Sequence, residues 1–312
     1  PGRSRHEPGE RASASGGRSV TWVNDVIQGI MLGGFYGMLA CGLALMFGLM
    51  RIINLAHGDI AVLGAYLIYV VLQHWNTSPF LAILPVLPVM LLIGYLLQRL
   101  LLERSLRSGL LVPLLTTFGL SIVIQNLLQQ GFSPDVRSLG SNAGSVATAS
   151  WQITSQLSIS AIGALTLGVA VVIFGALQLF LSRTRAGRQM RATAQDPDTA
   201  ELVGINSRAV YARATAIAVA IAAIGGMFLA IRSDFYPYSG PTYLIFAFEA
   251  VVIGGLGGSL WATLAGGIVL GVAQTIGGQI NPEYPVLAGH IVFLLVLLSP
   301  RGGLINLRRA TA

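Results

Sequence analysis

Stretches without a single charged residue constrain this chain more than any other feature of its sequence. Residues 26–50, 110–130 and 157–182 contain no Asp, Glu, Lys or Arg. A helix needs roughly 20 apolar residues to cross the hydrocarbon core of a bilayer, and each of these stretches is long enough. Five further apolar segments complete the set: residues 60–75, 80–98, 214–231, 250–279 and 284–300. The sequence therefore predicts an all-α integral membrane protein, a polytopic bundle of about eight transmembrane helices.

The small number of charges excludes an ordinary soluble domain. Only 10% of the 312 residues are charged, whereas soluble domains carry about 25% charged residues. The chain has no Lys, and its Arg residues flank apolar segments instead of forming one polar face, so the net charge of +7 does not indicate a nucleic-acid partner. The single cysteine, Cys41, lies inside the first apolar stretch, which excludes a disulfide within the chain.

The distribution of Arg residues predicts the orientation of the membrane domain. Arg residues cluster in residues 103–109, in residues 183–213 and in the C-terminal tail, and the positive-inside bias assigns these regions to the cytoplasm. Counting segments back from them places the N-terminus outside. Residues 1–21 form an Arg-, Gly- and Ser-rich tail that we expect to be disordered. Its Arg residues oppose the bias, so we expect either that neighbouring helices hold the first helix in place or that one early segment is re-entrant.

Glycine spacing indicates how closely the helices pack. Gly29, Gly33 and Gly37 are each four residues apart, as are Gly267 and Gly271. Glycines at this spacing let helix backbones approach each other in lipid, where hydrophobic burial cannot drive association. The sequence therefore predicts a tightly packed bundle.

Two apolar segments are interrupted, near residues 52–59 and near residues 247–258. Each combines an ionisable or amide side chain with a glycine break, and one lies in each half of the chain. In transporters, paired interrupted segments mark broken helices beside the translocation path. No sequence repeat supports the pairing, so a substrate pathway or gate here is a hypothesis. Its residues are Asn54, His57, Asp59, Glu249, Gly254 and Gly255.

His57 and Asp59 allow other interpretations. A metal site needs three or four convergent ligands, and the sequence offers no second cluster beside this pair, so we assign neither a metal ligand nor a catalytic residue. Asp59 also suits the start of a helix, where a carboxylate caps exposed N–H groups.

Glu249 is the only acidic residue deep in an apolar stretch. A carboxyl group within a membrane is costly, and it either faces a pathway or belongs to a structural ion pair or hydrogen bond. The sequence leaves both roles open. Gln125, Asn126 and Gln274 are lesser candidates for a polar lining, because hydrogen bonds between helices are their default role.

The hydrophilic segment 183–208 contains a predicted short helix. Asp196 and Asp198 open this helix, with Pro197 in its first turn and Gly204 at its end. Its apolar face consists of Ala200, Leu202 and Val203. These residues alone fit two roles equally: a helix that docks on a motor, or a solvated connector that its Arg side chains hold near anionic lipid.

Several segments together resemble one family of transporters. They are INLAHGDIAVLGAY at residues 53–66, residues 103–126 with TFGLS at their core, GRQMRATAQDPDTAELVGIN at residues 187–206, AVVIGGLGGSLWATLAGGIVLG at residues 250–271, and SPRGGL at residues 299–304. The chain resembles the membrane permease subunits of bacterial ATP-binding cassette (ABC) importers for branched-chain amino acids. The resemblance implies a permease domain over residues 22–304 and a cytoplasmic tail over residues 305–312.

The resemblance also implies partners. Such a permease is a multi-pass protein of the bacterial inner membrane that works with a second homologous permease, two cytoplasmic ATP-binding subunits and a periplasmic or lipid-anchored substrate-binding protein. Transport by alternating access would be driven by those ATPase subunits, which bind the ATP. This chain has no phosphate-binding GxxxxGK(S/T) loop, and we expect it to need no cofactor and to be no enzyme.

In this family a cytoplasmic coupling loop rests on the ATPase, so the resemblance favours the docking role for residues 183–208. The residues that match the coupling loop are Gly187, Arg188, Arg191, Ala192, Asp196, Ala200, Gly204 and Ile205.

Three alternatives stay open at this point. Similar permeases carry urea or short amides. An ion-coupled secondary transporter would use Asp59 and Glu249 as its coupling carboxylates. An intramembrane enzyme would rest on His57 with Asp59, but it lacks a third catalytic group and a Ser or Cys nucleophile at a suitable motif.

Overall fold

The computed structural model describes residues 10–106, 109, 111–154 and 157–299. Seven helical segments in this part of the chain are long and apolar enough to cross a membrane: Trp22–Met50, His57–Trp75, Pro79–Leu106, Leu111–Phe132, Ala161–Arg183, Ser207–Arg232 and Leu260–Ile280. Two shorter apolar helices, Gly240–Gly254 and Pro285–Leu298, accompany them. The predicted all-α polytopic membrane bundle is confirmed.

The helices of the bundle are α1 (Glu10–Met50), α2 (His57–Trp75), α3 (Pro79–Leu97), α5 (Leu111–Phe132), α7 (Ala161–Arg183), α10 (Ser207–Arg232), α11 (Gly240–Gly254), α12 (Leu260–Ile280) and α13 (Pro285–Leu298). A π-helical turn η1 (Gln98–Leu102) joins α3 to α4 (Glu103–Leu106). The remaining elements are η2 (Ser141–Ala143), α6 (Ser145–Thr148), the antiparallel strands β1 (Ser150–Thr154) and β2 (Leu157–Ser160), α8 (Arg185–Gln195) and α9 (Pro197–Leu202).

The first helix begins earlier than the sequence predicted. α1 starts at Glu10, so residues 10–21 are helical, although we expected them to belong to a disordered tail. Nucleation is the costly step of helix formation and propagation is cheap, so an apolar span can extend its helix into a flanking segment with Ala and Arg. Residues 1–9, the predicted tail 305–312 and all of SPRGGL after Ser299 lie outside the described residues.

The predicted break inside residues 250–279 is present, but the helix before it starts earlier than expected. Gly255 and Gly257, with φ of +100° and +72°, separate α11 from α12. α11 itself begins at Gly240 and carries a Pro in its first turn, where Pro is well tolerated. Glu249 therefore lies within the helix rather than at its edge.

Glycines bring the central helices into backbone contact. α1 packs along α12. A Cβ atom on Gly267 would lie 2.6 Å from the backbone N of Gly37, and one on Gly271 would lie 2.7 Å from Cα of Gly33. These distances leave no room for a side chain, so the tight packing predicted from the glycine spacing is confirmed.

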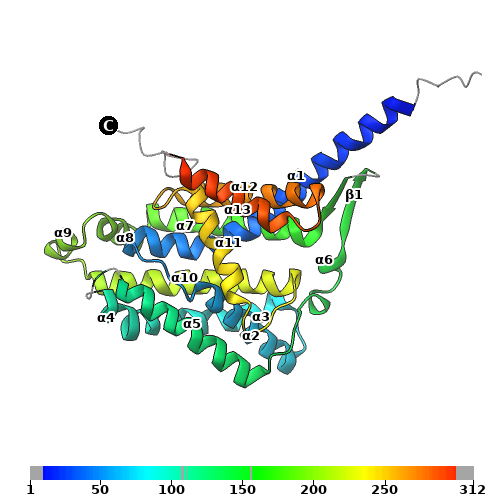
Figure 1. Cartoon of the computed structure of the whole chain (residues 1–312). Coiled ribbons are helices and arrows are strands. Elements are labelled where there is room, and N and C mark those ends of the chain that lie inside the picture. Colours follow the sequence, from blue (N-terminus) through cyan, green and yellow to red (C-terminus); the bar gives the residue numbers. More distant parts are fainter. Residues whose placement is uncertain (1–9, 107–108, 110, 155–156, 300–312) are drawn as a thin grey trace, which may run out of the picture.

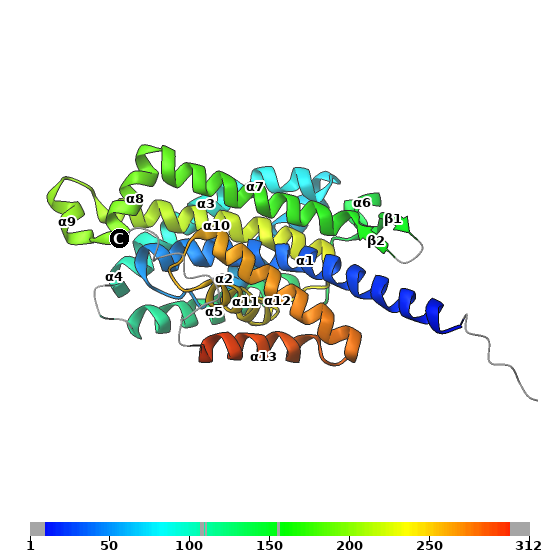
Figure 2. The same ribbon diagram turned by 90° about the horizontal axis from the view of Figure 1, so that it is seen from above.

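Two halves with the same order of elements form the bundle. α1 and α10 pack against each other; α1 also packs on α11 and α12, while α10 packs on α2 and α3. α1 runs toward the end of the molecule that carries α8 and α9, whereas α10 runs away from that end (Figures 1 and 2). A short non-helical segment follows each of these two helices and leads into α2 or α11. The halves thus form an inverted structural repeat of the kind found in transporters.

The hydrophilic elements separate to the two ends of the bundle. α4, α8 and α9 lie at one end, and the start of α1 and the β1–β2 hairpin lie at the other (Figure 1). The predicted topology requires this separation, because it assigns the Arg-bearing segments around α4 and α8 to one side and the N-terminus to the opposite side.

Candidate functional site

The segment between α1 and α2 turns back into the bundle. α1 ends at Met50, yet His57 Nε2 donates a hydrogen bond to the backbone O of Leu39, 2.9 Å away. Leu39 lies eleven residues before the end of α1, which at 1.5 Å per residue is roughly 16 Å back along the helix. α2 therefore begins inside the bundle, and residues 51–56 form a re-entrant segment that turns back along α1, whereas α2 itself continues as one of the helices long enough to cross a membrane.

Buried polar groups hold this re-entrant segment in place. Asn54 Oδ1 accepts a hydrogen bond from the backbone N of Ala56 at 3.1 Å, and its Nδ2 faces Met46 Sδ at 3.7 Å. The backbone N of Leu55 donates to Thr117 Oγ1 at 3.1 Å. Each contact gives a hydrogen-bond partner to a polar group that would have none in lipid. Asn54 and His57 thus organise the break between the helices.

Asp59 lies in the first turn of α2, as the sequence predicted for a helix start, but its side chain does not cap the helix. The N-cap residue is Ala56, and no side chain caps this helix end. Instead, Ser121 Oγ donates to Asp59 Oδ2 at 2.5 Å, and Gln125 Nε2 donates to Oδ1 at 3.0 Å. The carboxylate belongs to a contact between helices because two donors on α5 face it. Among the described residues, no group of three His, Cys, Asp or Glu side chains could hold a metal ion.

A polar stripe runs along α5. Thr117, Ser121, Gln125 and Gln129 are spaced four residues apart, so they share one face of the helix. The first three bond to the re-entrant segment and to Asp59, and Gln129 accepts a hydrogen bond from Tyr238. Of this stripe, only Gln125 was predicted as a candidate for a polar lining. The four-residue spacing of polar side chains in an apolar helix is the signal that indicates the other three.

The starts of α2 and α11 meet inside the bundle. A Cβ atom on Gly58 would lie 2.8 Å from the backbone C of Gly240, and one on Gly240 would lie 2.6 Å from the backbone N of Asp59. The first interrupted region, residues 52–59, therefore meets the second half of the chain, but at a point outside the predicted region 247–258. The convergence point in the second half is Gly240, however, and not the predicted Gly254 and Gly255. Those glycines lie at the other end of α11, roughly 20 Å away.

Glu249 packs between helices. It is 2% exposed, and its Oε1 accepts a hydrogen bond from His290 Nδ1 on α13. Beside it, Tyr36 donates to Gln274 Oε1 at 2.6 Å, and the His290 ring stacks on Phe246. These contacts join α11 to α13 and α1 to α12. They support the structural role for Glu249 over a role in lining the pathway.

A substitution at Glu249 separates these two roles. Because Gln keeps an oxygen that accepts from His290, we expect Glu249→Gln to transport within about twofold of wild type per folded molecule. Glu249→Leu removes that acceptor and should lower stability by about 1–3 kcal/mol. Uptake, together with thermal unfolding in detergent, measures both effects. Loss of uptake in Glu249→Gln at unchanged stability would instead assign this carboxyl group to the pathway.

Successive side-chain caps order the predicted coupling loop. Thr184 Oγ1 accepts from the backbone N of Gly187 at 2.9 Å, and Asp196 Oδ1 accepts from Asp198 and Thr199 backbone N at 3.0 and 3.1 Å. The Thr199 hydroxyl, 2.6 Å from Asp196 Oδ2, holds the pKa of that carboxyl below its usual range. The predicted helix start at Asp196 is confirmed.

The eight predicted coupling residues divide into buried and exposed sets. The buried or half-buried members are Gly187, Ala192, Ala200 and Ile205. The exposed members are Arg188, Arg191, Asp196 and Gly204, the last with φ of +83°. The predicted apolar face needs a correction, because Ala200 is 3% exposed and faces inward, whereas Leu202 and Val203 are 88% and 73% exposed. Leu202 and Val203 therefore form an exposed apolar pair at the end of the loop, which we call the apolar tip.

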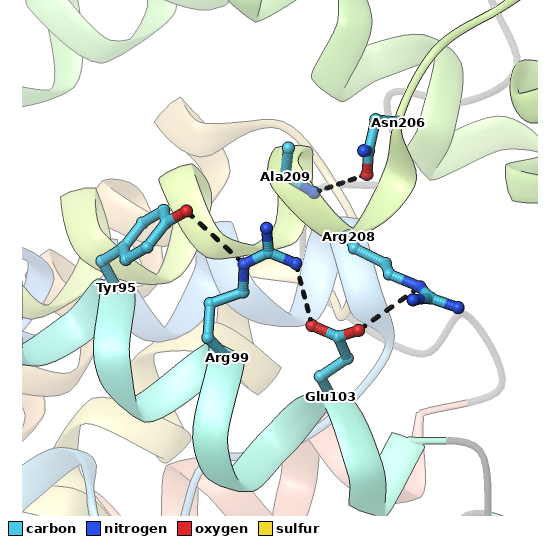
Figure 3. Close-up of polar contacts among 6 residues, drawn as sticks. All are labelled: Tyr95, Arg99, Glu103, Asn206, Arg208 and Ala209. Carbon is cyan, nitrogen blue, oxygen red and sulfur yellow. Dashed lines mark hydrogen bonds and ion pairs between the residues drawn. The ribbon is translucent and has the colours of Figure 1, made fainter.

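An ionic link fixes this loop to η1 and α4. Glu103 lies 3.2 Å from Arg99 Nη1 and 3.3 Å from Arg208 Nε, and Asn206 caps α10 through the backbone N of Ala209 at 3.0 Å (Figure 3). Glu103 therefore joins η1–α4 to the first turn of α10. Arg99 and Glu103 are four residues apart, but no local pattern predicts the pair of Glu103 with Arg208, because these two residues are far apart along the chain.

The re-entrant starts of α2 and α11 and the projecting α8–α9 loop define a polytopic membrane permease. A family model described as a branched-chain amino acid transport system permease component matches residues 26–299. The chain belongs to this family.

Curated relatives agree with the family and match almost the full length of the chain. The permease protein BraD of Pseudomonas aeruginosa is 29% identical over 297 residues, covering 90% of this chain and 95% of BraD. The LivH proteins of Salmonella typhimurium and Escherichia coli are 29% and 28% identical over 304 residues, covering 91% of this chain and 96% of each relative. All three are named as permease proteins of high-affinity branched-chain amino acid transport systems.

Proposed function

We propose that this chain is the permease subunit of an ABC importer that moves branched-chain amino acids across a bacterial inner membrane by alternating access. The observation that carries the proposal is the ordered α8–α9 projection, whose apolar tip is exposed among the residues that the structure describes. An exposed apolar tip on a capped helix suits a partner that buries it. The names of the relatives support the substrate class.

The partners follow from this assignment. Two cytoplasmic ATP-binding subunits would receive the apolar tip and supply the ATP hydrolysis. A second homologous permease would complete the pathway, and a periplasmic or lipid-anchored protein would deliver the substrate. In this proposal the chain itself binds no cofactor.

The contact between α2 and α5 is suited to the conformational change. α5 packs on α2, η1 and α4, and the polar stripe supplies hydrogen bonds to the re-entrant segment. A hydrogen bond that can be exchanged for one with water contributes only about 0.5–1.5 kcal/mol. The glycine contacts between α1 and α12 are backbone packing contacts, which cannot be exchanged for hydrogen bonds with water in this way. We therefore propose that α5 moves relative to a fixed α1–α10–α12 core during transport.

Reconstitution tests the proposed function. Liposomes that contain this chain with its partner permease and ATPase subunits should accumulate labelled leucine only when binding protein is present outside and ATP inside. Urea offered in place of leucine serves as the matched substrate control. Leucine accumulation by the purified chain alone on an ion gradient would overturn the ABC assignment, and would favour the secondary transporter with Asp59 and Glu249 as coupling groups.

A further inference from the structure

A cleft opens at the end of the bundle that carries α8. Its volume is about 310 Å³, and it lies between the last turns of α1, the end of α7, α8 and the loop before α12. Leu45 and Met190 are buried in its wall, whereas Gln178, Arg191 and Ser259 are exposed. The cleft thus combines apolar walls with a cationic and polar mouth.

A tryptophan marks the depth of this cleft in the membrane. Trp261 follows the lining residue Leu260, is 43% exposed, and packs on Phe174 of α7 with ring centroids 6.2 Å apart. Trp side chains concentrate where the hydrocarbon core meets the lipid headgroups. The mouth of the cleft therefore lies at headgroup level, on the side that the positive-inside bias assigns to the cytoplasm.

α8 presents a basic face at the same level. Arg185, Arg188 and Arg191 are spaced three residues apart and exposed, and residues 183–195 contain no acidic side chain. The opposite face of α8 is buried through Gly187, Met190 and Thr193. Within the described residues, none of the three Arg side chains forms an ion pair. Arg188 Nη1 donates a hydrogen bond to the backbone O of Arg183 at 3.0 Å, whereas the guanidinium groups of Arg185 and Arg191 have no hydrogen-bond partner among the described residues and are available to an external anion.

We propose that this cleft binds an anionic phospholipid of the cytoplasmic leaflet, with its phosphate on the Arg191 guanidinium and the first part of an acyl chain against Leu45, Leu49 and Leu181. The site is amphiphilic, with a basic mouth above an apolar wall. Such a site suits an amphiphilic ligand, in which a phosphate ester is joined to a hydrocarbon chain. The proposal rests on the membrane topology and does not depend on the transport activity.

The position of the cleft gives the lipid a regulatory role. Arg191 and Met190 belong to α8, and Gly257 and Gly258 belong to the break after α11. A lipid in the cleft would therefore contact both the helix that leads to the apolar tip and the loop that ends a re-entrant helix. We expect anionic lipid to increase coupled transport by stabilising this arrangement.

Native mass spectrometry of the purified full chain, loaded with phosphatidylglycerol or phosphatidylcholine, tests the proposal. We expect selective retention of phosphatidylglycerol. Arg191→Gln should weaken that retention about fivefold, the effect of one basic residue near an anionic surface. Gly48→Leu should weaken it without any change of charge, because Gly48 lines the cleft and a Cβ atom added there would meet no atom within 4 Å. Arg188→Gln is the matched control, since it removes the same charge from α8 outside the cleft.

Three results would overturn the proposal. Equal retention of phosphatidylglycerol by Arg191→Gln, Gly48→Leu and the control would exclude the cleft as the site. Displacement of the lipid by an excess of glycerol 3-phosphate would identify a phosphate site without a lipid. Unchanged lipid retention in Arg191→Gln would also overturn it, and loss of the ATPase subunits from the same variant in a separate copurification would assign this Arg to the protein partner. Because the measurement needs no transport, it stands apart from the uptake test of the proposed function.

Discussion

Gly240→Ala is expected to lower uptake by about tenfold or more. The added Cβ atom would lie 2.6 Å from both Cγ and the backbone N of Asp59. The start of α2 cannot yield easily, because His57 ties it to α1 and α5 holds the Asp59 side chain. Overpacking a well-packed contact costs about 1–3 kcal/mol, and each 1.4 kcal/mol is tenfold in an equilibrium constant. We therefore expect α11 to be displaced from α2, with a defect in uptake by the reconstituted transporter.

Two further variants test whether the loss of uptake arises from the contact between α2 and α11. Gly58→Ala approaches the same contact from α2, where its Cβ would lie 2.8 Å from the backbone C of Gly240, and it should reproduce the defect. Gly168→Ala on α7 is the control, because the added Cβ atom would meet no other part of the protein within 4 Å. If Gly240→Ala transported like Gly168→Ala, the meeting of the two helix starts would have no part in the transport cycle.

The sequence predicted those features that local chemistry determines. The start of α9 depends on Asp196 and on backbone groups two and three residues later, and its end depends on Gly204 in a left-handed conformation. All of these signals lie within ten residues. The membrane spans were likewise predictable, because the need to satisfy backbone groups inside lipid allows few structures other than helices.

Contacts between distant residues could not be predicted in the same way. Asp59 bonds to Ser121 and Gln125, which lie 62 and 66 positions away. The expected cap of α2 by Asp59 is absent, and the carboxylate instead accepts hydrogen bonds from two side chains of α5. The importance of Gly240 was not predictable, because it arises from close approach to Gly58 and no local pattern indicates that contact. One sequence without aligned relatives carries no information about such pairs.

Leu202→Ala is expected to weaken the association with the ATPase subunits by about tenfold or more, and to reduce uptake accordingly. Leu202 is 88% exposed in this chain, so its truncation should leave the fold within about 0.5 kcal/mol of wild type. If a partner buries the side chain fully, its removal costs about 1.5–3 kcal/mol of association free energy. Copurification of the ATPase subunits with the tagged permease, together with uptake, measures the two effects.

The comparison variants distinguish docking from a general surface effect. Val203→Ala truncates the second residue of the apolar tip and should also weaken association. Val136→Ala truncates an apolar side chain that is 63% exposed between α5 and η2, and should change neither readout. Leu202→Met keeps the volume and should restore association. Full association and uptake in Leu202→Ala would mean that no partner buries this tip, and α8–α9 would then be a solvated connector whose Arg side chains contact lipid.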